Sequence, residues 1–115
     1  MEAENTVLTG CDITAHAELN LVRKVSASVA PGALADAILY SSAEPCVMCC
    51  GAIYWSGIRR VVFGVSAPSL ASVTGGHYVI ESREIYARLK PGIEVMGPVL
   101  ESEGLAEHRR FWPGC

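Results

Sequence analysis

The sequence predicts one α/β domain spanning residues 1–115, with three layers in which helices cover both faces of a mixed, mostly parallel central sheet. Half of the residues are hydrophobic and only 18% are charged, which is typical of a packed globular chain. Residues 36–42 read as an apolar run of strand length, a pattern that favours a strand buried on both faces. A second such run follows at 60–65 after one helix-length segment, and a strand–helix–strand unit of this kind is parallel and right-handed.

The first part of the chain predicts a strand end, a loop and a helix. Residues 1–13 contain turn-forming pairs around a glycine and an aspartate, so we expect a strand that runs into a loop there. From Thr14 to about Ser26, apolar residues recur every three or four positions, and Arg23 and Lys24 suit the C-terminal end of a helix.

The second part continues the alternation of strands and helices. A helix is expected from Cys46 to about Ser56, ended by Gly57. Proline and glycine residues favour a loop over 66–78, whereas Pro91 and Gly92 stop a helix over 80–90. We expect a short strand near the sheet edge over 93–99 and a last helix over 102–112, capped by Ser102.

Two cysteines and one histidine have the spacing of a catalytic zinc site. Cys46 and Cys49 are three residues apart and so lie on one face of the predicted helix. With His16 they provide three ligands that suit Zn²⁺, leaving the fourth tetrahedral position to water. Glu18 could reach that water without binding the metal. A Cys-x-x-Cys redox protein is the alternative, but it gives His16 and Glu18 no role.

These residues resemble a known superfamily. Thr14-Ala15-His16-Ala17-Glu18 together with Glu44-Pro45-Cys46-Val47-Met48-Cys49 is similar to the cytidine deaminase-like superfamily, whose zinc deaminases carry His-x-Glu followed by Pro-Cys-x-x-Cys. The stretch Gly51–Trp55 resembles its guanine deaminase and nucleoside deaminase branch. The resemblance extends from about residue 5 to residue 112. It implies the cytidine deaminase-like fold in an N-terminally truncated form, without the helix and hairpin that usually come first.

The resemblance also implies an activity, a cofactor and a set of site residues. The activity is zinc-dependent hydrolytic deamination of a nucleobase or nucleoside, with guanine or a related purine as the leading substrate and cytosine as another. Glu18 would transfer the protons. The residues implied to contact the substrate are Asn5, Ala17 and Trp55. Apart from the resemblance, the aromatic side chains of Phe111 and Trp112 near the C-terminal end could close the site over a flat base.

Other interpretations exist for these substrate residues. Asn5 could be an ordinary turn asparagine, Trp55 could belong to the core, and Phe111 and Trp112 could dock the last helix. His77 and His108 are expected on the surface. The loop at 72–77 lacks the acidic residues of guanine deaminases, so the base stays open.

Charge and composition limit the partners. A net charge of −3 argues against a general nucleic-acid binder. A tRNA adenosine deaminase shares both motifs and is an alternative function, although the acidic charge fits it less well. A non-catalytic zinc-stabilised binding subunit is another alternative. The longest apolar stretch is too short to cross a membrane, and the acidic start and odd number of cysteines favour the cytoplasm. An open sheet edge without the hairpin would favour a homodimer.

Overall fold

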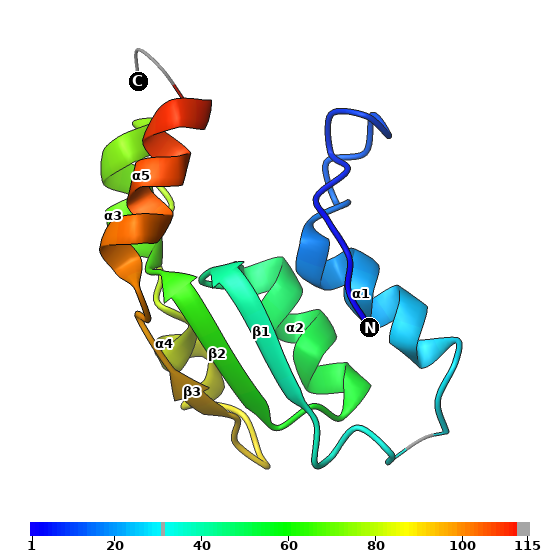
Figure 1. The fold of residues 1–115 in the computed structure, drawn as a ribbon. Helices are drawn as coiled ribbons and strands as arrows, with labels where there is room; N and C mark the ends of the chain where they lie inside the picture. The colour runs from blue at the N-terminus through cyan, green and yellow to red at the C-terminus, as the bar shows by residue number, and fades with distance from the viewer. Residues whose placement is uncertain (31, 113–115) are drawn as a thin grey trace.

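The computed structural model describes residues 1–30 and 32–112, and in this part of the chain five helices accompany one three-stranded sheet (Figure 1). None of these helices has the length and apolar character required to cross a membrane. In chain order the elements are α1 (Ala17–Ser26), β1 (Ile38–Ala43), α2 (Val47–Ser56), β2 (Arg60–Val65), α3 (Ala67–Thr74), α4 (Ser82–Tyr86), β3 (Glu94–Met96) and α5 (Glu101–Phe111).

The sheet has the order β1-β2-β3, and both neighbouring pairs are parallel. Leu39 pairs with Val61, and Val61 pairs with Val95 on the other side. The predicted β1–α2–β2 unit is therefore confirmed, together with the α/β class. The antiparallel member of the expected mixed sheet is absent from residues 1–30 and 32–112.

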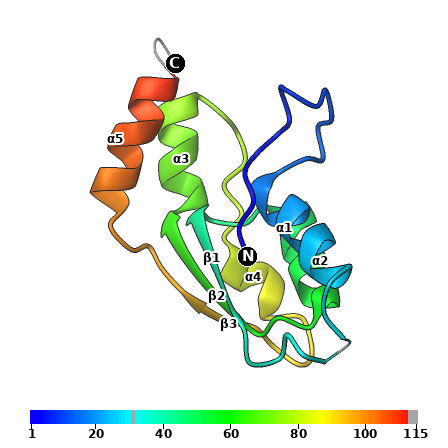
Figure 2. The same cartoon turned by 45° about the vertical axis from the view of Figure 1, so that its right-hand side comes forward.

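Helices α1, α2 and α4 lie on one side of the sheet (Figure 2). The core formed there takes Val22 from α1, Ile53 from α2 and Tyr86 from α4, packed with Leu39 and Val61 of the strands. These side chains are at most 9% exposed. This core anchors both helices that carry the predicted metal ligands.

The prediction that residues 36–42 are buried on both faces is wrong for this part of the chain. Leu39 is 2% exposed, but its neighbour Tyr40 is 71% exposed on the opposite face. Alternate side chains of a strand point to opposite faces, and no described helix covers the second face of β1. A continuous apolar run therefore did not distinguish a strand that is buried on both faces from a strand that is buried on one face.

Helices α3 and α5 pack together beyond the carboxyl ends of β1 and β2 (Figure 1). Helix α3 replaces the loop that we expected over 66–78. Pro68 lies in its first turn, where the missing amide hydrogen costs nothing. The Ser66 side chain caps the helix by accepting from the Ser69 amide, and Gly75 ends it with a φ of 71°.

Several element ends also differ from the prediction. The helix expected over 80–90 is restricted to α4, and the strand expected over 93–99 is restricted to β3. Residues 1–13 form turns and no strand. Helix α5 is preceded by Leu100 at a φ of 51°, with no side-chain cap from Ser102. Such ends depend on tertiary packing, which a local pattern does not record.

Candidate active site

The three predicted metal ligands lie where two helices begin. His16 is the residue directly before α1, and Cys46 is the residue directly before α2. His16 and Cys46 are therefore the N-cap residues of these helices. The helix expected from Thr14 had placed His16 within its first turn instead. Cys49 follows within the first turn of α2 and is fully buried. The shared core of α1 and α2 brings these two helix starts together.

The distances between the ligand atoms fit one tetrahedral zinc ion. The Nδ1 atom of His16 lies 3.5 Å from the Sγ of Cys46 and 3.6 Å from the Sγ of Cys49. Zinc bonds of about 2.3 Å to sulfur and about 2.0–2.1 Å to nitrogen, at a tetrahedral angle, place nitrogen and sulfur about 3.6 Å apart. His16, Cys46 and Cys49 thus have the geometry to hold a zinc ion.

These three residues would provide three of the four ligands of a tetrahedral zinc ion. Among the histidine, cysteine and acidic side chains that the structure describes, these three alone form a metal-sized group. Cys50 is adjacent in sequence, but its thiol lies against the Pro45 carbonyl oxygen at 3.4 Å. Burial raises the pKa of the Cys50 thiol to about 11. A zinc ion with three protein ligands is characteristic of catalytic sites.

The two thiols of the cluster differ in their proton affinity. A hydrogen bond with Cys49 lowers the pKa of the Cys46 thiol to about 5. The same hydrogen bond, together with burial and the nearby charge of Glu18, raises the pKa of Cys49. A divalent cation that binds both sulfurs would therefore displace the proton of the Cys49 thiol.

Glu18 stands beside the ligands without being one of them, as the sequence predicted. It lies in the first turn of α1. Its Oε1 accepts a hydrogen bond of 2.8 Å from Ser41 Oγ, and its Oε2 lies 3.6 Å from the Cys49 sulfur. Ser41 belongs to β1, so the carboxylate is held between the helix start and the end of the strand.

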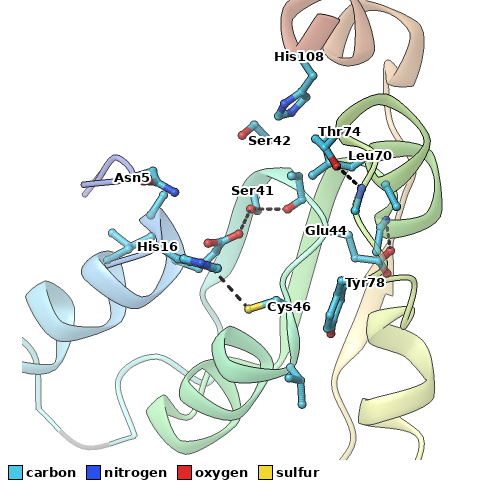
Figure 3. A pocket seen from close by; sticks show the side chains of 18 of the residues that line it. Asn5, His16, Ser41, Ser42, Glu44, Cys46, Leu70, Thr74, Tyr78 and His108 are labelled. Atoms are coloured by element: carbon cyan, nitrogen blue, oxygen red, sulfur yellow. Dashed lines mark hydrogen bonds between the residues drawn. The ribbon is translucent and has the colours of Figure 1, made fainter. Parts of the chain in front are cut away.

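The cluster opens into a cavity of about 850 Å³ at the carboxyl end of β1. Such crevices at strand ends are the usual ligand sites of open α/β sheets. Figure 3 shows Asn5 and His16 on one side of this pocket, Leu70, Thr74 and Tyr78 on the other, and His108 above.

Three of the predicted substrate residues line the pocket, namely Asn5, Ala17 and Trp112. Asn5 also accepts a hydrogen bond of 3.0 Å from the Val7 amide, so it forms the asparagine turn that was the alternative interpretation. The turn interpretation is therefore confirmed, and the substrate contact of Asn5 stays a prediction.

The other two predicted substrate residues lie outside the pocket of their own chain. Trp55 is 84% exposed, with its ring against the edge of Tyr54. The alternative that Trp55 belongs to the core is wrong. Phe111 is also exposed and packs edge-on against Trp112 at 4.8 Å. Of the C-terminal aromatic pair, Trp112 alone contributes to the pocket wall.

The sequence analysis missed a whole wall of the pocket. Leu70, Ala71 and Thr74 project from α3 into the pocket, and His108 also lines it although we expected it on the surface. His77 is exposed as expected and lies at the pocket rim. The spacing of Leu70, Ala71 and Thr74 is helical and offered a signal, which the proline and glycines around it obscured. The position of His108 depends on how α5 packs, and no local pattern reports that.

Comparison with known proteins agrees with this geometry. Residues 1–65 match a family described as the cytidine and deoxycytidylate deaminase zinc-binding region. A probable cytosine deaminase of Schizosaccharomyces pombe is 42% identical over 119 aligned positions, which cover 99% of this chain and 72% of that protein. The guanine deaminase of Bacillus subtilis is 47% identical over 62 residues, covering 54% of this chain and 40% of that protein.

Solved structures show the same similarity in three dimensions. The guanine deaminase from Nitrosomonas europaea superposes with a TM-score of 0.76 at 28% identity, covering 95% of this chain and 63% of that one. A mutant protein solved in complex with 8-azaguanine gives a TM-score of 0.77 at 29% identity, covering 98% and 64%. The chain thus spans less than two thirds of these solved proteins.

Proposed function

This chain belongs to the cytidine and deoxycytidylate deaminase zinc-binding family, and from this premise we propose that it releases ammonia from a nucleobase by hydrolysis. The observation that carries the proposal is the position of Glu18. A carboxylate outside the ligand set lies 3.6 Å from a zinc ligand and faces the same cavity. That arrangement suits proton transfer beside a metal-activated water.

The cofactor of the proposed reaction is zinc. His16 Nδ1 and the sulfurs of Cys46 and Cys49 would hold it. When bound, zinc would lower the pKa of a water molecule toward neutrality and so provide the nucleophile.

Glu18 would move the protons of the reaction. Its carboxylate accepts one proton from the attacking water and donates it to the ring nitrogen of the base. It then takes the remaining proton from the newly added hydroxyl group and transfers it to the exocyclic amine, the carbon–nitrogen bond breaks, and ammonia leaves while the water oxygen becomes the new carbonyl oxygen. Ser41 Oγ lies 2.8 Å from Oε1 and 2.6 Å from the Ala43 carbonyl oxygen, so it would help to orient the carboxylate at the end of β1. Proton transfer of this kind contributes about 10²–10⁴ in rate.

Backbone amides at the helix starts would assist. Ala17 is the first residue of α1 and lines the pocket, and Cys46 directly precedes α2. The first amides of a helix have no partner within the helix. They are therefore suited to stabilise negative charge that develops on the substrate oxygen.

We propose a free base or its nucleoside as the substrate, rather than a nucleic acid. The net charge of −3 disfavours a phosphate backbone. The structural neighbours named guanine deaminase support guanine, whereas the probable cytosine deaminase that covers 99% of this chain supports cytosine. The missing acids of the loop at 72–77 weaken the case for guanine and leave both bases as candidates.

An ammonia-release assay tests the proposal. The zinc-loaded protein is incubated separately with cytosine, guanine, their nucleosides and a tRNA, and the metal-stripped protein serves as control. We expect ammonia from at least one free base or nucleoside and none from the stripped control. Ammonia release from the tRNA alone would support the tRNA deaminase alternative. A zinc-loaded protein that releases no ammonia from any of them would support the non-catalytic binding subunit.

A further inference from the structure

A buried carboxylate outside the ligand set joins the metal centre to the opposite wall of the pocket. Glu44 lies in the loop between β1 and α2, two residues before Cys46, and is only 7% exposed. Buried carboxylates are rare unless their oxygens are satisfied. Its surroundings therefore indicate what it holds in place.

Three hydrogen bonds end on the Glu44 carboxylate. Oε1 accepts from the Ala67 amide at 2.8 Å, and Oε2 accepts from the Ser82 amide at 2.7 Å and the Ser82 hydroxyl at 2.6 Å. Ala67 is the first residue of α3 and Ser82 is the first residue of α4. The Glu44 amide also donates to the Val65 carbonyl oxygen at 2.7 Å. One residue thus ties the loop to β2, α3 and α4.

The link from Glu44 to the metal ligand is short and stiff. Only Pro45 lies between Glu44 and Cys46. Pro45 is fully buried, and its ring fixes the backbone angle φ. The Pro45 carbonyl oxygen also receives the Cys50 thiol at 3.4 Å. A displacement of Glu44 would therefore also displace the Cys46 sulfur.

We propose that Glu44 is a positioning residue, which sets the Cys46 sulfur for zinc and fixes the α3 wall against it. The inference rests on the proposed zinc chemistry of the site. Leu70 and Thr74 on α3 face the ligands across the cavity, and α3 begins at the amide that Glu44 holds. The Glu44 carboxylate thereby sets the distance between the metal site and the side chains of α3 that face it.

The test measures metal binding rather than turnover. In the full chain, Glu44→Gln keeps the side-chain shape but places an amide N–H₂ against donors that need an acceptor. Groups that orient metal ligands typically contribute about 10–100-fold in affinity. We expect a loss of this size in zinc affinity, measured by competition with a chromophoric chelator. The absorption bands of the cobalt(II)-loaded protein should also shift, because they report the ligand geometry.

Glu101→Gln is the matched control. Glu101 also accepts at the start of α3, from the Ser66 hydroxyl at 3.0 Å and the Ser66 amide at 3.4 Å. Glu101→Gln makes the same change of charge at an acceptor whose hydrogen bonds come from Ser66. Its zinc affinity and cobalt spectrum should equal those of the unaltered chain.

A second variant decides the matter if Glu44→Gln does not fold. Ser82→Ala removes one donor to Oε2 and leaves the amide donor in place, so a smaller loss of zinc affinity in the same direction is expected. Circular dichroism identifies the folded variants. A folded Glu44→Gln with unchanged affinity and cobalt spectrum would overturn the proposal, as would an unchanged Ser82→Ala where Glu44→Gln is unfolded. Absence of zinc binding by the unaltered chain would instead count against the proposed function itself.

Discussion

Replacing Glu18 by glutamine removes the proposed proton carrier and preserves the size of the side chain. The amide oxygen can still accept the 2.8 Å hydrogen bond from Ser41. The other atom, which faces the Cys49 sulfur at 3.6 Å, becomes an N–H₂ group that cannot take a proton from water. The zinc ligands themselves are unchanged, so the variant should bind zinc and fail in turnover.

The size of the effect follows from the role assigned to the carboxylate. Loss of a general acid–base typically costs about 10²–10⁴ in rate. At 1.36 kcal/mol for each factor of ten, this corresponds to about 2.7–5.4 kcal/mol of barrier. The loss should fall on kcat, because Glu18 acts on the reacting atoms.

The assay measures ammonia release at a saturating concentration of the nucleobase or nucleoside substrate. Atomic absorption measures the zinc content of the same samples. Glu107→Gln is a suitable control, since Glu107 is exposed and its ion pair with Arg110 lies on the surface. It should leave both quantities unchanged. If Glu18→Gln keeps the kcat of the unaltered chain, the proposed role of Glu18 is wrong. If the variant loses both turnover and zinc, the loss of turnover is explained by the loss of the metal.

Two further predictions concern metal binding and packing. Zinc needs both thiolates, and the pKa of Cys46 is lowered to about 5 while that of Cys49 is raised. Binding should therefore expel about one proton between about pH 6 and 8, and zinc affinity should fall about tenfold per unit as pH falls. Calorimetry in buffers of different ionisation enthalpy measures this, and a pH-independent affinity would contradict it. Gly64→Ala should destabilise the fold by about 1–3 kcal/mol, because a Cβ there would lie 2.6 Å from a backbone oxygen of β1. Gly51→Ala, which meets nothing within 4 Å, should stabilise α2 by about 0.5–1 kcal/mol. Equal chemical-denaturation midpoints for the two variants would refute this comparison.

The metal centre could be predicted because its information is local. The spacing of Cys46 and Cys49 within one helix sets their geometry, and His16 with Glu18 begins another helix. The two short motifs, together with the family resemblance, therefore predicted the three side chains that the structure brings together and the carboxylate beside them. The β1–α2–β2 unit was predictable for the same reason, as its apolar runs and its intervening helix are contiguous.

The pocket wall could not be predicted, because it depends on how separate elements pack. We expected a loop in place of α3 because Pro68 is a common loop residue. Proline is equally suited to the first turn of a helix, which is where Pro68 lies. His108 enters the pocket only because α5 packs on α3. Trp55 shows the opposite case, in which a side chain expected in a core or a pocket lies exposed on α2.

Glu44 illustrates a third kind of limit. Its position before Pro45 and Cys46 was visible in the sequence, but the three donors that it accepts from belong to residues 23 and 38 positions later. Pairings over such separations arise only after the strands and helices have assembled. The hydrogen bonds on which the proposed role of Glu44 rests are therefore visible only in the structure.

X-ray absorption at the zinc edge of the loaded chain tests the central claim most directly. The account predicts two sulfur ligands at about 2.3 Å and two nitrogen or oxygen ligands at about 2.0–2.1 Å, one of the latter exchanging when a base is added. A zinc ion with four protein ligands that ignores added base, or a chain that retains no zinc, would contradict it.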